Sequence, residues 1–145
     1  DILNRKKCSV ILTPHPGEMS RLSGLSISEI QSARIKTAED FADRFDVTVA
    51  LKGEGTVVAA RGGKTAVNPS GNCGMATGGT GDVLSGVVAA LAAQGCTPYD
   101  SAVLGVYLHG LAGDIAAAEK GVHGLIASDL CGALPAAFLE TLKFL

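Results

Sequence analysis

The 145-residue sequence contains no tryptophan, and its two tyrosines and four phenylalanines make up only 4% of the chain. Yet 47% of the residues are hydrophobic, so alanine, valine and leucine, together with 19 glycines, supply most of the interior. Such small residues suit helices that pack closely on a sheet. The length corresponds to one domain or a part of one.

Strong charge and long apolar runs are also missing. Twelve basic and fourteen acidic side chains give a net charge of −2, without a long basic run, which disfavours nucleic-acid binding. No apolar run approaches the roughly 20 residues of a membrane helix without Gly, Pro or charge interrupting it. The first eight residues, DILNRKKC, lack the apolar centre of a signal peptide. We therefore expect a cytoplasmic protein with no membrane partner.

The four cysteines form no CxxC pair and show no zinc-ligand spacing. We expect reduced thiols, most of them filling the core, and no metal ligands from the protein. Cys73 lies in a glycine-rich segment, but no neighbouring residue would activate its thiol. We therefore assign it no catalytic role. The cysteines are Cys8, Cys73, Cys96 and Cys131.

Short β-branched runs alternate with longer stretches of helical periodicity. Strands are predicted at residues 9–13 and 47–51, and the strands 56–60 and 65–67 form a hairpin around the Arg61–Lys64 turn. The alternation predicts an α/β fold, a layered sheet with flanking helices that is at least partly parallel.

Helix signals fill the intervals between the strands. Pro16 begins a short helix to Leu22, and Ser26 with Glu29 forms a capping box. The helix that follows places one apolar face toward the core. That face comprises Ile35, Ala38, Phe41, Ala42 and Phe45, and further helices are expected at 83–93, from Pro98 to about Lys120, and after a cap at Ser128 or Asp129, where Pro135 kinks or restarts the last helix.

Three polar or glycine-rich segments follow predicted strands. They are His15–Glu18, the KGEGT segment at 52–56, and the long glycine segment at 68–82. In layered α/β folds, ligands bind beyond the carboxyl ends of the strands. We therefore expect the three segments to meet at one edge of the sheet.

The glycine segment, NPSGNCGMATGGTGDVLSG at 68–86, carries the strongest functional signal. Glycines let backbone N–H groups approach a ligand, and the N-terminus of the helix after them favours an anion such as phosphate. Asp82 at this helix start is either a cap or a group with a chemical task, such as accepting a proton from a hydroxyl that attacks the phosphate. Neither a Walker loop nor GxGxxG is present.

With its neighbours, this segment resembles a known family. NPSGNCGMATGGTGDVLSG, TPHPGEMSRL, LKGEGTVVA, VYLHGLAGD and GLIASDL are similar, in order and spacing, to segments of the ADP-dependent NAD(P)H-hydrate dehydratases in the ribokinase-like superfamily. GTGD alone marks only the superfamily, whereas HPGE combined with the glycine loop is more specific. The resemblance covers essentially the whole chain.

The resemblance implies repair of hydrated NADH and NADPH, with ADP as co-substrate cleaved to AMP and phosphate in the presence of Mg²⁺. It makes Asp82 the catalytic base and assigns substrate contacts to His15 and Asp82, with Glu18 a weaker candidate. Asn68 and Asn72 are expected to brace the loop, Met75 to pack, and His109, Asp114 and His123 to be structural. The nucleotide-binding set is Lys52, Gly53, Glu54, Gly55, Thr56, Gly79, Thr80 and Gly81.

The family's catalytic domain is nearly twice this length, and DILN resembles a segment from its middle. We therefore expect residues 1–145 to form the C-terminal half of the domain, with a central first strand. A homo-oligomer, or a chain carrying the N-terminal half, is then expected to complete the site. Two alternatives stay open: a superfamily kinase acting on a small alcohol such as a vitamin precursor, and a non-catalytic nucleotide-binding half of an assembly.

Overall fold

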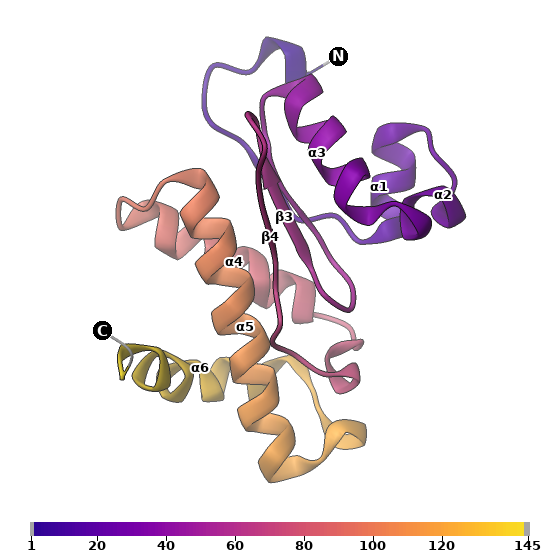
Figure 1. Ribbon diagram of the computed structural model, residues 1–145. Coiled ribbons are helices and arrows are strands. Elements are labelled where there is room, and N and C mark those ends of the chain that lie inside the picture. The colour runs from indigo at the N-terminus through magenta and orange to yellow at the C-terminus, as the bar shows by residue number, and fades with distance from the viewer. Residues whose placement is uncertain (1, 144–145) are drawn as a thin grey trace.

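A four-stranded sheet separates two groups of helices in the computed structural model, which describes residues 2–143 (Figure 1). The strands lie in the order β1-β2-β3-β4, with β1 and β2 parallel and the other pairs antiparallel. The prediction of a layered, partly parallel α/β fold is confirmed. The strands are β1 (Ile11–Leu12), β2 (Thr48–Leu51), β3 (Val57–Ala60) and β4 (Lys64–Val67).

Six α-helices and three short 3₁₀ helices accompany the sheet in the described chain. The α-helices are α1 (Pro16–Ser23), α2 (Ile27–Ser32), α3 (Arg34–Phe45), α4 (Thr80–Ala93), α5 (Pro98–Lys120) and α6 (Ala127–Leu142). The 3₁₀ helices are η1 (Leu3–Arg5), η2 (Cys73–Met75) and η3 (Val122–Gly124).

Side chains of β2 and β3 alternate between two separate cores. Val49 and Leu51 join the cluster that contains the buried face of α3, whereas Ala50 between them packs with α4 and α5 on the other face. The same alternation holds in β3, because successive strand residues point to opposite faces of a sheet. Both faces are therefore covered, which explains why every residue of β2 is buried.

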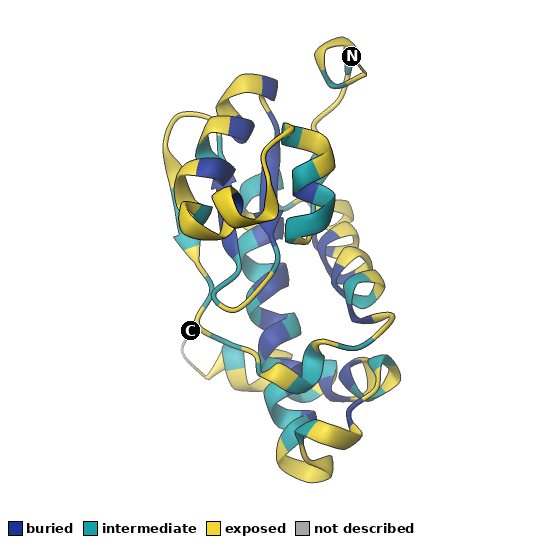
Figure 2. Cartoon of the chain, turned by 90° about the vertical axis from the view of Figure 1, so that its right-hand side faces the viewer, coloured by how far each residue is buried: buried dark blue, intermediate teal, exposed yellow. Residues whose placement is uncertain are grey.

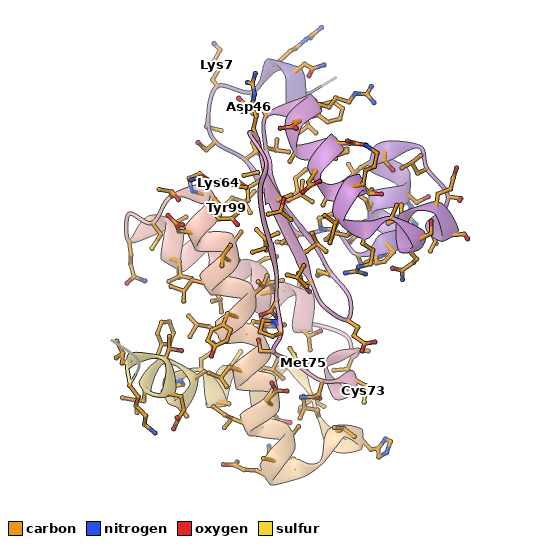
Figure 3. All side chains as sticks on the ribbon, viewed as in Figure 1. Lys7, Asp46, Lys64, Cys73, Met75 and Tyr99 are labelled. Carbon is orange, nitrogen blue, oxygen red and sulfur yellow. The ribbon has the colours of Figure 1, made fainter. Side chains whose placement is uncertain are left out.

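Helix α5 crosses the second face of the sheet and also contacts α4 and α6 (Figure 1). In Figure 2 the buried positions follow the strands and the facing sides of the helices. The ammonium nitrogen of Lys64 lies 5.6 Å from the ring centroid of Tyr99 at the start of α5 (Figure 3). This contact joins the β3–β4 hairpin to the helix. By length and composition, α5 is the one described helix that could cross a membrane, but half of its apolar window is buried inside the structure, as in a core helix.

Several local expectations are corrected. The first strand has only two residues instead of the predicted 9–13, and both are half-buried. Among the described strands it pairs with β2 alone, so the second neighbour expected for it stays a prediction. The helix predicted after Ser26 divides at Ala33, whose extended φ of −143° interrupts it, and Ile35 turns outward with 48% exposure. Pro135 lies inside a continuous α6, so the helix does not restart there.

The expectation for the cysteines is confirmed only in part, whereas the capping box at Ser26 is confirmed. All four thiols are free, as predicted, but Cys8, Cys73 and Cys131 are exposed, so they do not fill the core. The Ser26–Glu29 capping box is present, and Asp129 accepts the Ile126 N–H at the start of α6. Lys120 pairs with the Asp129 carboxylate and, as the largest cause, holds its pKa below the usual value.

We predict that Gly105→Ala destabilises the fold, because a methyl group there would lie 2.6 Å from Cγ2 of Val88 where α5 crosses α4. Overpacking of this kind costs about 1–3 kcal/mol in the free energy of unfolding. Gly86→Ala in α4 is the control, since its methyl group meets nothing within 4 Å and should stabilise the helix by up to about 1 kcal/mol. Urea denaturation measures both, and equal effects would contradict the close α4–α5 contact.

Candidate active site

Three loop segments from different parts of the chain line one cavity of about 950 Å³. They are the His15–Glu18 segment after β1, residues 52–56 after β2, and the glycine loop that leads into α4. The predicted meeting of these segments is confirmed. The segments after β1 and β2 meet because these parallel strands end at the same edge of the sheet.

His15 fixes the start of α1 while also lining the cavity. Its Nδ1 accepts hydrogen bonds from the N–H groups of Gly17 at 3.0 Å and Glu18 at 3.3 Å, so this nitrogen carries no proton. Glu18 returns the interaction, because its Oε2 accepts the His15 N–H at 2.7 Å. The pair forms a capping box in which histidine takes the place of the usual serine or threonine. This structural role was missed at the sequence level, and the substrate role of His15 stays a prediction.

Lys52 brings positive charge to the cavity. Its Nζ lies 3.5 Å from Oε2 of Glu18 and close to Gly81, where an added Cβ would be 3.4 Å away. The backbone hydrogen bond from His15, and then the charge of Lys52, lower the pKa of Glu18. Lys52 thus lies beside the first turn of α4, where its charge and the helix dipole would both attract a bound anion.

Side chains hold the glycine loop from both sides, as predicted for Asn68 and Asn72. Asn68 Nδ2 donates to the carbonyl oxygens of Ser70 and Val106, at 3.0 and 3.2 Å. Asn72 Oδ1 accepts the Gly74 N–H at 3.0 Å. The side-chain amides of these two residues therefore hold the loop in place without a ligand.

The carboxylate of Asp114 on α5 holds the same loop. It accepts the Gly71 N–H at 2.8 Å and Nδ2 of Asn72 at 2.9 Å, which confirms its structural role. On η2, Met75 packs closely on Gly113, where an added Cβ would overlap the Met75 sulfur. Cys73 on the same element is exposed, and both residues line the cavity (Figure 3).

Helix α4 begins without a side-chain cap. Its N-cap is Gly79 in the left-handed conformation with a φ of 89°, and no side chain bonds to the helix N-terminus there. Thr80 turns its hydroxyl away from the helix, toward the carbonyl oxygens of Met75 and Thr77, each at 2.9 Å. The N–H groups of Thr80 and Gly81 thus remain available to a ligand, whereas the Asp82 N–H donates to the Gly79 carbonyl oxygen at 3.1 Å.

Asp82 is the third residue of α4 and lines the cavity. The interpretation of this carboxylate as a helix cap is not supported, since no capping hydrogen bond joins it to Gly79. It is exposed to the cavity solvent, where a hydroxyl can reach it. As an acidic residue in the first turn it is still favoured by the helix dipole, and its chemical role stays a prediction.

His109 on α5 contacts the first turn of α4. Its Nε2 lies 2.9 Å from the carbonyl oxygen of Thr80, which can only accept, so Nε2 carries the proton. Burial, as the largest cause, lowers the pKa of His109, and the charge of Lys52 acts in the same direction. The ring is therefore held neutral as part of the cavity floor, which agrees with the structural role expected for it.

The chain is similar to proteins that are already known. Residues 1–136 match a family model described as NAD(P)H-hydrate dehydratase. The "Bifunctional NAD(P)H-hydrate repair enzyme Nnr" of Moorella thermoacetica is 48% identical over 126 residues, which are 87% of this chain and 24% of that protein.

Two solved structures share the fold. The ADP/ATP-dependent NAD(P)H-hydrate dehydratase of Bacillus subtilis, co-crystallized with ATP/Mg²⁺, superposes with a TM-score of 0.87 at 36% identity, over 91% of this chain and 48% of that one. A ribokinase-like superfamily protein of Enterococcus faecalis gives 0.74 at 31% identity, over 96% of this chain and 49% of that one. The chain therefore spans about a quarter of the bifunctional relative and about half of these two solved chains.

We predict that stability falls as the pH drops below the ordinary histidine pKa of 6.5. The folded-state pKa of His109 is lowered, so the unfolded chain takes up the proton first and is favoured until the folded pKa is passed. The lowered pKa of Glu18 acts only below its ordinary value of 4.5. Urea denaturation at several pH values should show a flatter profile between these two values for His109→Gln, and an unchanged slope would contradict the burial of a neutral ring.

Proposed function

The chain belongs to the NAD(P)H-hydrate dehydratase family, and we propose that it carries the nucleotide-binding and proton-accepting part of an ADP-dependent dehydration of NAD(P)H hydrate. The observation that carries the proposal is Asp82, a carboxylate on the first turn of α4 that makes no helix cap and lines the same cavity as Lys52 and the glycine loop. The matching relatives bear the names of enzymes of this reaction, and they support the assignment of the substrate.

The diphosphate of ADP fits the positive end of the cavity. The free amides at Thr80 and Gly81, the helix dipole and the Lys52 ammonium can neutralise charge on the phosphate that is transferred. Residues 52–56 are the proposed contacts for the rest of the nucleotide, as the resemblance implies. His15 and Glu18 also line the cavity and are the proposed contacts for the hydrated nicotinamide.

The proposed reaction has two steps. The ring hydroxyl gives its proton to Asp82 while its oxygen forms a bond to the terminal phosphorus of ADP, and the bond between that phosphorus and the AMP oxygen breaks. The ring carbon–oxygen bond then breaks, phosphate leaves with the electron pair, and loss of a proton from the adjacent carbon restores the double bond. The products are NAD(P)H, AMP and phosphate.

Mg²⁺ in this proposal is bound through the nucleotide. Among residues 2–143 no group of three His, Cys, Asp or Glu side chains could hold a metal ion. Magnesium is commonly held by substrate phosphates and water with one or two carboxylates, and the carboxylates that line the cavity are Glu18, Glu54 and Asp82. When bound, the ion would neutralise phosphate charge, and no step above depends on its position.

The reaction is tested with hydrated NADH, ADP and magnesium. We expect NADH absorbance to return with equal amounts of AMP and phosphate. Because the chain spans about half of its dehydratase relative, we propose that the 145 residues alone are inactive and that a homo-oligomer or a chain with the remaining half completes the site. The assay is therefore run with this chain alone and together with such a chain, and a cytoplasmic location stays a prediction.

The outcomes of this assay separate the alternatives. Phosphorylation of a small alcohol without return of NADH would favour a kinase of the same superfamily. ADP binding without turnover, even with the complementary chain, would favour a non-catalytic nucleotide-binding half. Full activity of the 145-residue chain alone would overturn the proposal that the site needs more than these residues.

We predict that Asp82→Asn lowers turnover about 10²–10⁴-fold, the usual effect of losing a general base. ADP affinity should stay near the wild-type value, because the amide has almost the same shape and the helix N-terminus is unchanged. Asp100→Asn is the matched control, since Asp100 is also the third residue of its helix but lies outside the cavity. Wild-type turnover in Asp82→Asn would reduce the carboxylate to a helix-end charge.

We predict that Lys52→Ala weakens ADP binding about tenfold, which corresponds to roughly 1.4 kcal/mol of lost phosphate interaction. Its effect on AMP binding should be smaller, because AMP lacks the terminal phosphate. Lys36→Ala serves as control, since Lys36 pairs only with Asp40 on the surface of α3. Calorimetric titration with both nucleotides measures the difference, and equal losses for ADP and AMP would remove Lys52 from the phosphate site.

A further inference from the structure

We propose that Arg34 is the positioning residue of the nucleotide loop, Lys52–Thr56, and sets the direction of its backbone N–H groups. The inference rests on the proposed function, because it assumes that this loop binds the nucleotide. Arg34 is the first residue of α3 and does not line the cavity, whereas all five loop residues do. It therefore acts on the cavity through the loop.

The guanidinium binds one carbonyl oxygen at the end of β2 and two carbonyl oxygens of the loop. Nη2 donates to Leu51 at 3.0 Å and to Gly55 at 3.3 Å, and Nη1 donates to Lys52 at 3.4 Å. Nη1 also donates to Oε1 of Gln31 at 3.1 Å, which steadies the side chain. A planar guanidinium can serve several acceptors at fixed angles, which the single ammonium of lysine cannot do.

These carbonyl directions determine where the loop amides point. In a trans peptide, the N–H of each residue points opposite to the preceding carbonyl. Because the carbonyls of Lys52 and Gly55 face the guanidinium, the N–H groups of Gly53 and Thr56 point away from it. Both of these residues line the cavity. The arrangement thus offers two amide donors to an anionic or polar part of the nucleotide.

Gly53 is shaped to fit this side chain. Its φ of 145° lies in a region that favours glycine, and a Cβ at this position would overlap the Arg34 guanidinium. Burial lowers the pKa of Arg34, because part of the charged group is removed from water. The carbonyl oxygens compensate for that desolvation, so loop and arginine depend on each other.

Arg34 is poorly placed for its own helix. A positive charge on the first residue of a helix opposes the macrodipole, and α3 has no side-chain cap at Ala33. Helix stability therefore does not explain an arginine here. Its contacts all lead to Gln31 and to the end of β2 with the loop that follows.

The test compares Arg34→Ala and Arg34→Lys with Arg44→Ala, a control on the same helix whose guanidinium stacks on Phe45 at 4.9 Å. Amide hydrogen exchange across residues 52–56 and ADP affinity are measured for each. For both Arg34 variants we expect faster exchange of the Lys52 N–H, the loop amide that donates to the Pro14 carbonyl oxygen at 2.8 Å, without a rise elsewhere in the chain. ADP affinity should be lower by about tenfold to hundredfold, the scale of a misplaced binding group. Millimolar guanidinium should restore both in Arg34→Ala, while methylammonium should not.

Gly53→Ala provides a second, independent readout. With Arg34 present, the added methyl group displaces the guanidinium and should speed loop exchange as Arg34→Ala does. In the Arg34→Ala background the same change should add little beyond the cost of its φ. Additive effects of the two substitutions would contradict a direct contact.

The outcomes distinguish this inference from the proposed function. If the wild-type chain binds no ADP even with its complementary half, the proposed function fails, but loop exchange still decides the role of Arg34. If ADP binds and the Arg34 variants keep both wild-type affinity and wild-type loop exchange, the positioning role is wrong. Exchange that rises equally throughout the chain would assign Arg34 to global stability instead and would also overturn the inference.

Discussion

Helix α4 begins at Gly79 with no side chain on its first amides, and unmade hydrogen bonds at a helix end need water or a ligand as partner. The surrounding structure keeps that end open. Thr80, which could turn its hydroxyl toward the helix, bonds instead to loop carbonyls, and Asp82 makes no cap. The local positive potential is then strengthened by Lys52, which is held beside Gly81 by its interaction with Glu18. An anion with several acceptor oxygens, such as a terminal phosphate, satisfies this arrangement best.

The other polar contacts of the cavity serve to hold this helix end and its loops in place. Asp114 and Asn72 hold the glycine loop against α5. His109, which also lies on α5, contacts the carbonyl oxygen of Thr80 at the start of α4. Arg34 does the same for the loop after β2. Among residues 2–143, no buried side-chain nitrogen or oxygen lacks a hydrogen-bond partner. A site ordered in advance loses less entropy when its ligand binds, which suits a reaction that depends on placing a phosphate accurately.

The sequence was sufficient for the strand order along the chain, the hairpin at Arg61–Lys64 and the meeting of three loops, because these follow from local patterns and from the geometry of parallel strands. The brace made by Asn68 and Asn72 could be predicted because such bonds lie within a few residues. Contacts across long separations could not be derived, since no local pattern records that Arg34 reaches carbonyls 17 to 21 positions away. His15 was missed as a cap because histidine rarely takes that role, and the break at Ala33 has no glycine or proline to signal it.

The central claim is that the open end of α4 and Lys52 form a site for the terminal phosphate of ADP. The most direct measurement is a titration of the chain with ADP and with AMP, followed residue by residue through backbone amide resonances. The account predicts that ADP shifts the amides of Thr80 and Gly81 strongly while AMP leaves them nearly unchanged, with both nucleotides shifting the loop at 52–56. Equal responses of the α4 amides to ADP and AMP, or shifts confined to other surfaces, would contradict it.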